Sequence, residues 1–426
     1  MASHASKTSD STLHISRSEP PNFSSANIPL STVNTIRNRP SASHAVQPAN
    51  AASIPFIVTS TFSNGDPDTK QFHHLFPDSF PKIDSDLGYG ASFIVQKAFL
   101  EDLQTLDTRK PAVALKRIRP SGPRGLESFH SVIKDLLCLT HPPLRGCPNV
   151  VSLLGLGWEK SPSEGDYRLW PYLILEYSSI GNLADLQSVH KDLSLRCKKA
   201  MALDVAHGLY SVHCSNIIHG DVKSENVLVF PNQHDSYIAK LSDFGFATLD
   251  VDFPANKGRK LNIDDVRQTA RISTGTPPWT APEFGKVMKW EIAFKTDVYS
   301  WGLLVWRLFL NGQSPFAVFK GQFDRSATSV SVSPQDIQSW KEKNLLLPVA
   351  ISFSQTIQHP ISGELENAFR HSLAIEPEDR DLRRAFLPWK FGDRYVVGIH
   401  NYSTYSQDLL TQLLVGIKWI SSTNCL

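Results

Sequence analysis

One short stretch constrains this chain more than any other: residues 218–229, which read IHGDVKSENVLV. It sets Asp221, Lys223 and Asn226 at spacings of two and five residues, directly before an apolar run typical of a β-strand. Seventeen residues after Asn226, Asp243 begins an Asp-Phe-Gly triplet that follows another apolar segment. Carboxylate and amide oxygens bind Mg²⁺, a lysine neutralises a moving phosphoryl group, and a carboxylate can accept the proton of a substrate hydroxyl. The pattern therefore indicates phosphoryl transfer.

The stretch resembles the catalytic loop of eukaryotic protein kinases, and the Asp-Phe-Gly triplet resembles their metal-binding motif. The resemblance implies that Asp221 orients and deprotonates the acceptor hydroxyl, while Lys223 offsets charge on the γ-phosphate of ATP. It also implies that Asn226 and Asp243 hold the metal ions. Gly220 departs from the family, which usually has arginine at this position, so the loop reads His-Gly-Asp.

A second pair of motifs lies upstream. Residues 87–95 read LGYGASFIV, and Gly88 and Gly90 would let backbone N–H groups approach phosphate oxygens without a Cβ in the way. This stretch resembles a kinase glycine-rich loop, although Phe93 stands at the third glycine position. Further along, the sequence Val-Ala-Leu-Lys ends an apolar strand at Lys116. The resemblance implies that this lysine positions the α- and β-phosphates of ATP.

The carboxylate partner of Lys116 is expected on the next helix. Residues 126–139 carry apolar side chains at helical spacing and predict that helix. The family has a glutamate there, whereas the best-placed acid here is Asp135, whose side chain is one methylene shorter. Glu127, near the start of the helix, is the alternative. We expect Asp135 to form the pair and to count among the catalytic residues.

The nucleotide contacts follow from the resemblance alone. Apolar runs at 150–154 and 172–177 predict the last two strands of a five-stranded sheet, after which residues 176–178 would form the hinge that contacts adenine. The resemblance implies an ATP site made of seven residues: Gly88, Gly90, Val95, Ala114, Lys116, Glu176 and Leu228.

The segment after Asp-Phe-Gly ends in GTPPWTAPE at residues 275–283, which resembles the substrate-docking segment of kinases. The resemblance implies two structural contacts beyond it. Asp297, at the head of an apolar run, would hydrogen-bond the backbone of the catalytic loop, and Arg380 would pair with Glu283.

These landmarks cover about residues 81–390 and predict an α+β, bilobal protein-kinase-like fold. The small lobe, 81–177, would contain a five-stranded sheet and one helix, and the larger lobe, 178–390, would be mostly helical. Residues 1–80 are rich in Ser, Thr, Pro and Asn and predict a disordered tail. Residues 391–426 form a C-terminal extension beyond the last landmark.

We therefore expect an ATP- and Mg²⁺-dependent kinase that phosphorylates Ser and Thr of protein substrates, since Lys223 and Thr276 both match that class. The alternative is a pseudokinase that uses the same fold as a nucleotide-binding or scaffolding module. Phe93, Gly220 and the absence of the expected glutamate on the 126–139 helix favour this alternative. An active enzyme is favoured by the presence of all four polar residues that transfer would need, because a non-catalytic fold has no packing need for them. These residues are Lys116, Asp221, Asn226 and Asp243.

Composition argues against several other classes. A net charge of +2 with 20% charged residues implies neither a nucleic-acid nor a membrane partner. The five cysteines lack C-x-x-C spacing, so we expect reduced thiols and no zinc site. No apolar run reaches the roughly 18–20 residues of a membrane span. We expect a soluble intracellular protein, cytoplasmic or nuclear, and the sequence leaves its oligomeric state open.

Overall fold

A computed structural model of the chain describes residues 80–90, 93–100, 111–119, 125–160, 169–232, 236–249, 269–319 and 332–389. The chain divides into two units, 1–48 and 49–426, and every described residue belongs to the second. The tail and the C-terminal extension expected from the sequence lie outside the described residues, apart from Phe80. No helix in the described part of the chain is both long enough and apolar enough to cross a membrane.

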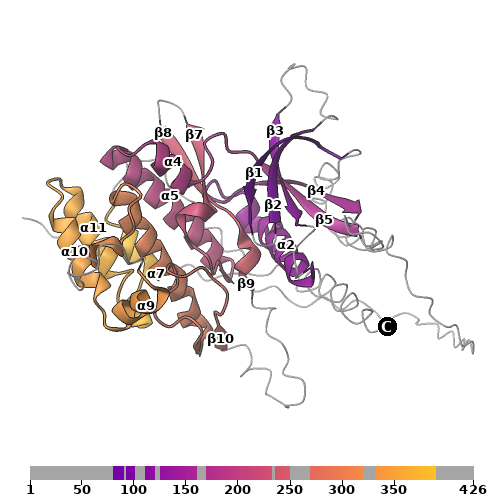
Figure 1. Cartoon of the computed structure of the whole chain (residues 1–426). Helices are drawn as coiled ribbons and strands as arrows, with labels where there is room; N and C mark the ends of the chain where they lie inside the picture. The colour runs from indigo at the N-terminus through magenta and orange to yellow at the C-terminus, as the bar shows by residue number, and fades with distance from the viewer. Residues whose placement is uncertain are drawn as a thin grey trace, which may run out of the picture. The chain divides into compact units, whose positions relative to one another are not determined.

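The first lobe is a five-stranded antiparallel sheet (Figure 1). Its strands are β1 (Lys82–Tyr89), β2 (Phe93–Phe99), β3 (Ala112–Ile118), β4 (Leu153–Lys160) and β5 (Leu169–Glu176). They lie in the order β1-β2-β3-β5-β4, and each neighbouring pair runs antiparallel. The five-stranded sheet predicted from the sequence is confirmed.

The strand predicted at 150–154 is only partly right. β4 begins at Leu153, whereas Val150 forms a parallel bridge with Leu241 in β8 (Ser236–Leu241). The backbone N–H of Val151 donates to the carbonyl of the same Leu241 at 2.8 Å. These two valines therefore connect the sheet to the second lobe instead of extending it. An apolar run does not distinguish the two outcomes, because both bury the side chains.

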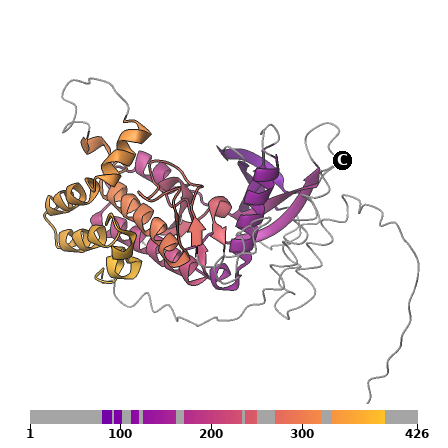
Figure 2. The ribbon, with the colours of Figure 1, turned by 90° about the horizontal axis from the view of Figure 1, so that it is seen from below.

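Helix α2 (Gly125–Thr140) packs against one face of the sheet (Figure 2). Side chains of β3 alternate between the two faces, as a pleated strand requires. Ala114 and Ile118 join the same core cluster as the buried face of α2, whereas Val113 and Leu115 pack in a separate cluster on the opposite side. Lys116 has the same parity as Ala114 and Ile118, so the pleat directs it towards α2.

The second lobe is mostly helical (Figure 1). Its helices are α4 (Leu183–Val189), α5 (Leu195–Cys214), α7 (Trp290–Phe309), α9 (Pro334–Glu342), α10 (Leu346–Gln355), α11 (Ile361–Arg370) and α12 (Leu382–Phe386), and the short helix α3 (Pro142–Arg145) precedes β4. Three short antiparallel pairs carry the loops: β6 (Ile217–Ile218) with β9 (Thr248–Leu249), β7 (Val227–Asn232) with β8, and β10 (Thr269–Arg271) with β11 (Val287–Lys289). The predicted α+β, bilobal fold is confirmed.

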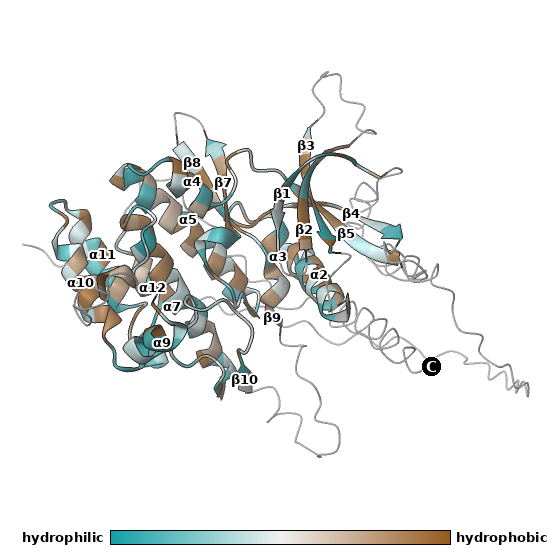
Figure 3. Ribbon diagram, viewed as in Figure 1, coloured by the Kyte–Doolittle hydropathy of each residue, from teal (hydrophilic) through white to brown (hydrophobic). Residues whose placement is uncertain are grey.

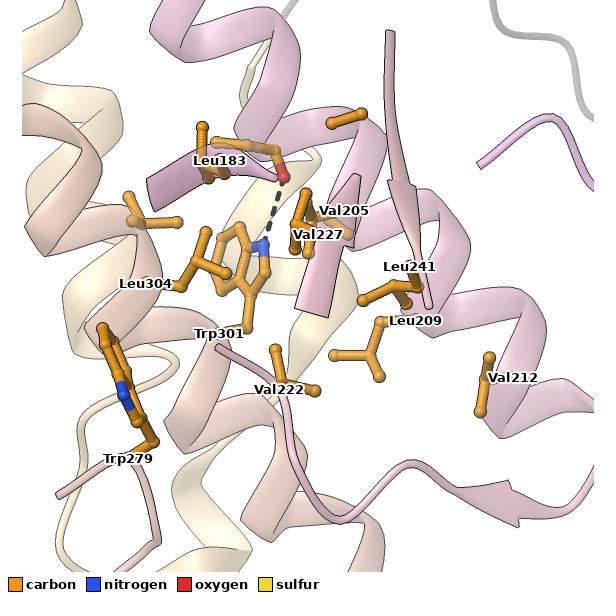
Figure 4. Packing of buried hydrophobic residues seen from close by; sticks show 14 of the residues in the cluster. Leu183, Val205, Leu209, Val212, Val222, Val227, Leu241, Trp279, Trp301 and Leu304 are labelled. Carbon is orange, nitrogen blue, oxygen red and sulfur yellow. Dashed lines mark hydrogen bonds between the residues drawn. The ribbon is translucent and has the colours of Figure 1, made fainter. Parts of the chain in front are cut away.

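Helix α7 forms the centre of this lobe, and hydrophobic residues run along it in Figure 3. Trp301 lies at the middle of the packing (Figure 4). Its indole N–H donates to the carbonyl of Ala202 in α5 at 3.1 Å, so the buried ring leaves no polar atom without a partner. The ring packs among aliphatic side chains from several elements, including Leu183, Val205, Val222, Val227 and Leu304.

Arg380 connects three parts of the helical lobe. Its guanidinium donates to both carboxylate oxygens of Glu283, at 2.6 and 3.0 Å. It also donates to the backbone carbonyls of Lys295, Ala374 and Ile375. The side chain is fully buried. The pair expected from the sequence is confirmed, and it fixes the end of the docking segment to the base of the lobe.

Replacing Glu283 with Ala should lower the free energy of unfolding by about 3–5 kcal/mol, because it leaves a buried guanidinium without its carboxylate. Urea denaturation of the purified variant measures this loss. Glu366→Ala is the control, since it removes an exposed pair with Arg370 and should change stability little. Losses of similar size in both variants would contradict the buried role of Glu283.

Candidate active site

The ammonium of Lys116 lies between two carboxylates from distant parts of the chain. Its Nζ is 2.6 Å from Asp135 Oδ2 on α2 and 2.6 Å from Asp243 Oδ1. The ring of Phe93 lies 4.6 Å from the same atom. Burial alone would lower the pKa of Lys116, but the two carboxylates outweigh it and raise that pKa above its usual value. The lysine is therefore charged at neutral pH.

Asp135 also connects α2 to the Asp-Phe-Gly triplet. Its Oδ1 accepts a hydrogen bond from the backbone N–H of Phe244 at 2.7 Å. The next residue, Gly245, packs against the same helix, because a Cβ there would lie 2.0 Å from Ser131 Oγ and that side chain would have to move. Glu127, the alternative acid, is exposed in the first turn of α2 and lies away from this cluster.

The catalytic-loop residues gather around Asp221. Its Oδ2 accepts hydrogen bonds from Lys223 Nζ at 2.7 Å and from Asn226 Nδ2 at 2.8 Å. Lys223 Nζ also donates to Thr276 Oγ1 at 2.6 Å, which joins the catalytic loop to the docking segment. The other carboxylate oxygen, Oδ1, is buried and has no hydrogen-bond partner among the described residues. The site thus contains one buried acceptor whose hydrogen-bonding capacity is not used by the described residues.

Asp297 and His219 hold this loop in place. The carboxylate of Asp297, at 1% exposure, accepts from the backbone N–H groups of His219 at 2.8 Å and Gly220 at 2.9 Å. The ring of His219 donates from Nε2 to the carbonyl of Ser242 at 3.1 Å and lies 4.8 Å from the ring of Phe244. The expected contact between Asp297 and the loop backbone is confirmed.

Gly220 occupies a backbone position that favours glycine. Its φ is +77°, in the left-handed region that side chains disfavour. A Cβ at this position would lie 2.7 Å from the carbonyl oxygen of Phe246, closer than carbon and oxygen normally approach. The local backbone conformation therefore favours glycine over the arginine that is usual in the family.

The two predicted metal ligands come from neighbouring loops. The N–H of Ser242 donates to the carbonyl of Asn226 at 2.9 Å, so Asn226 lies beside the residue that precedes Asp243. Asp243 is exposed, which leaves its carboxylate open to a cation. No group of three or more His, Cys, Asp or Glu within the described ranges could hold a metal by itself. One carboxylate and one amide suit Mg²⁺, which usually takes its other ligands from water and substrate phosphates.

The glycine-rich stretch forms the turn between β1 and β2. Gly88 lies opposite Val95 across the two strands, and Val95 lies opposite Lys116 on β3. Gly90 N–H donates to the carbonyl of Phe93 at 2.8 Å. A Cβ on Gly88 would meet nothing within 4 Å, so packing within the protein does not require glycine at this position.

The other predicted nucleotide residues lie on three strands. Ala114 is buried on β3 opposite Leu175, Glu176 ends β5, and Leu228 lies on β7. The carboxylate of Glu176 accepts two hydrogen bonds from Lys240 Nζ, both at 2.8 Å. Its side chain therefore has a structural contact of its own, and its backbone N–H donates to the carbonyl of Ser152 at 3.1 Å. Its backbone carbonyl is the group that would contact a base.

Two contacts in this region were missed at the level of sequence. Phe93 counted there only as a missing glycine, although its ring lies against Lys116. The signal was present, because Phe93 and Val95 share a face of β2 and Val95 pairs with Lys116. The second is Lys341, which donates to two carbonyls of the docking segment and has no motif around it that would predict this contact.

Comparison with known proteins gives one family. Residues 82–343 match the model of a family described as protein tyrosine and serine/threonine kinases. The chain is 31% identical over 218 residues to the tyrosine-protein kinase csk-1 of Caenorhabditis elegans, covering 50% of this chain and 34% of that protein. It is 30% identical over 228 residues to the probable serine/threonine-protein kinase PBL17 of Arabidopsis thaliana, covering 53% and 45%.

Human receptor-interacting serine/threonine-protein kinase 1 is 32% identical over 190 residues, covering 45% of this chain and 26% of that protein. The chain thus spans less than half the length of each of these relatives. The family match covers more than half of the chain and includes the catalytic loop, the Asp-Phe-Gly triplet and the docking segment. The chain therefore belongs to the protein tyrosine and serine/threonine kinase family.

Proposed function

We propose that this chain transfers the γ-phosphate of ATP, with Mg²⁺, to serine and threonine hydroxyls of protein substrates. The observation that carries the proposal is the carboxylate of Asp221. One of its oxygens is held by Lys223 and Asn226, while the buried Oδ1 has no donor among the described residues. A general base needs such an acceptor within reach of the proton that it removes.

In the proposed reaction, Asp221 accepts a hydrogen bond from the acceptor hydroxyl, orients its oxygen and takes its proton as the new O–P bond forms. Lys223, bonded to Asp221, lies where it would offset negative charge on the transferred group. Because Lys223 also contacts Thr276, the base and the docking segment stay in register.

Lys116 would position the α- and β-phosphates, and its two carboxylate partners fix the direction of its Nζ. Asn226 and Asp243 would hold Mg²⁺, which when bound neutralises charge on the phosphates. Gly88 and Gly90 would let the backbone approach those phosphates, and the open space beside Gly88 supports this assignment. Val95, Ala114, Leu228 and the backbone of Glu176 would enclose the adenosine.

The choice of Ser and Thr over Tyr rests on the contact between Lys223 and Thr276. The family includes both classes, and the three relatives above comprise one named tyrosine kinase and two named serine/threonine kinases.

The alternative is a pseudokinase, which would have the same fold but would not transfer phosphate. Labelled ATP, Mg²⁺ and a generic protein substrate distinguish the two, with Asp221→Asn as the inactive control.

Replacing Asp135 with Ala should slow phosphoryl transfer by roughly 10²-fold, because Lys116 then loses its partner on α2. Glu127→Ala, on the same helix but exposed, should change the rate little. Initial rates with labelled ATP and a fixed protein substrate measure both. Small and equal effects would mean that Asp135 does not support Lys116 during the reaction.

Phosphoamino-acid analysis should yield phosphoserine and phosphothreonine, both from autophosphorylated protein and from a generic substrate. The reason is the Lys223–Thr276 contact at the acceptor position. Asp221→Asn protein, treated in the same way, should carry no label. A hydrolysate dominated by phosphotyrosine would overturn the assignment to the serine/threonine class.

Activity should not depend on phosphorylation of the segment that follows Asp-Phe-Gly. Gly220 offers no side chain to bind a phosphate there, and Arg271 already donates to the carbonyl of Gly285. The loop cations at 257, 259, 260 and 267 lie outside the described residues. Exposed ion pairs contribute about 0–1 kcal/mol, whereas a two-state switch needs about 5.5 kcal/mol to move from 1:99 to 99:1.

Two experiments test this independence: treatment of the active enzyme with phosphatase, and joint replacement of Thr269, Ser273 and Thr274 with Ala. The rate should stay within about threefold of the starting value in each, as expected when no charge-assisted bond is lost. A fall of tenfold or more in both, with the melting temperature unchanged, would show that a phosphate does control this segment.

A further inference from the structure

The docking segment is irregular between residues 277 and 282, so its carbonyl groups need partners outside a strand or helix. Side chains of the neighbouring helices provide them. Ser300 Oγ of α7 donates to the carbonyl of Trp279 at 2.8 Å. Gln338 Nε2 of α9 donates to the carbonyl of Pro282 at 3.0 Å. The shape of the segment thus depends on the large-lobe helices beneath it.

One further side chain holds two of these carbonyls. Lys341, on α9, donates from Nζ to the carbonyl oxygens of Pro278 and Thr280. The residue is 2% exposed, and the rings of Tyr299 and Phe316 lie 5.9 and 5.8 Å from Nζ. Within the described ranges, no carboxylate forms an ion pair with it. A buried lysine without an acid partner is unusual, because its charge loses hydration.

Packing alone does not account for this lysine. Ile337 lies four residues earlier on α9 and is also buried, so position 341 belongs to the apolar face of the helix. An aliphatic side chain would fill that face without desolvating an amine. What Lys341 adds is the pair of hydrogen bonds to the docking segment.

A cavity of about 480 Å³ opens between the docking segment and α9. Pro277, Pro278 and Thr280 line one side, and Ile337, Gln338 and Lys341 line the other. Pro278 and Thr280, the residues whose carbonyls Lys341 holds, therefore line this cavity. Moving them would change its width directly.

We propose that Lys341 is a positioning residue for substrate binding, which holds the Pro278–Thr280 turn in the shape that receives the substrate peptide. It acts through the docking segment and touches neither ATP nor the reacting atoms. The inference rests on the proposed function, since it assigns to α9 a part in peptide affinity.

Because Lys341 can gain or lose a proton, its proposed role predicts that peptide binding depends on pH. Burial lowers the pKa of Lys341 to about 7, and the carboxylate of Glu283 opposes this shift. The other charged group beside Tyr299 in the described part is Arg380, which is paired with Glu283. At the end of α9, Glu342 and the C-cap residue Lys343 are both exposed. A neutral amine has two hydrogens, which match the two carbonyls that it contacts.

The direction of the pH dependence follows from the difference between the pKa of Lys341 in the held turn and its pKa in the released turn. When the turn is released, Lys341 meets water and its pKa returns to about 10.4, so protonation favours release. The folded value is the lower one, so more protons are bound in the released or unfolded state between about pH 7 and 10. The held turn is therefore stabilised as pH rises through 7, and peptide affinity should rise with it.

The experiment measures the peptide KM at saturating ATP from about pH 6 to 8.5, with a peptide that has no group titrating in that range. In the unaltered protein and in Lys343→Met, which replaces an exposed lysine at the C-cap of α9, peptide KM should fall about fivefold or more as pH rises. In Lys341→Met, it should be flat and, at the highest pH, about tenfold above that of the unaltered protein. The kcat and the KM for ATP should stay within about twofold.

Lys341→Gln is the second variant, and its peptide KM should also be independent of pH, since the amide does not titrate. If neither variant folds, the unaltered protein and Lys343→Met decide the question, and a flat KM in both overturns the proposal. A loss of kcat equal to the change in KM in Lys341→Met would also overturn it, because a positioning role acts on peptide binding.

A second readout needs no activity. Amide hydrogen exchange of residues 276–283 should be faster in Lys341→Met than in Lys343→Met at one pH. Absence of phosphoryl transfer from every variant, with this difference present, would refute the proposed kinase function and keep the role of Lys341 in the turn. Equal exchange in the two variants would refute the role of Lys341 whether or not the protein is active.

Discussion

The ammonium of Lys116, shared by two carboxylates, is the interaction on which the rest of the active-site geometry depends. It joins β3 of the sheet to α2 through Asp135 and to the large lobe through Asp243. Without the cation, the buried carboxylate of Asp135 and the exposed carboxylate of Asp243 would face each other and repel. Asp135 extends the connection to the backbone of Phe244, so one charge cluster fixes the sheet, the helix and the Asp-Phe-Gly triplet together.

In the loops of the large lobe, many backbone N–H and carbonyl groups have no partner in a strand or helix. Buried charged side chains form hydrogen bonds with these groups instead. Asp297 accepts N–H groups of the catalytic loop, and Arg380 and Lys341 donate to carbonyls of neighbouring segments. An unpaired buried amide or carbonyl is costly, so these side chains have few tolerated replacements. The reactive loops are irregular, and a rigid helical base determines their shape.

Much of this could be predicted from the sequence, because order and spacing of the motifs are local properties. The strands and the α2 helix were predicted from these patterns, and the contacts of Asp297 and Arg380 were predicted from the family resemblance that the motifs carry. The periodicity of apolar residues does not reveal which residue, distant in the sequence, a given side chain will contact. Val150 would be buried in either lobe, and Phe93 appeared only as a missing glycine. Lys341 attracted no prediction, although it follows the apolar Ile337 at helical spacing. Each of these needed contacts made across long stretches of chain.

Gly220 limits how the sequence can drift. Its positive φ and the carbonyl oxygen of Phe246, 2.7 Å from where a Cβ would lie, exclude a side chain unless the neighbouring backbone moves. Replacing Gly220 with arginine is a single change in sequence, but it would also require a different backbone conformation. A side chain at position 220 therefore requires a change in the backbone after Asp-Phe-Gly as well, so the conformations of these two loops are coupled.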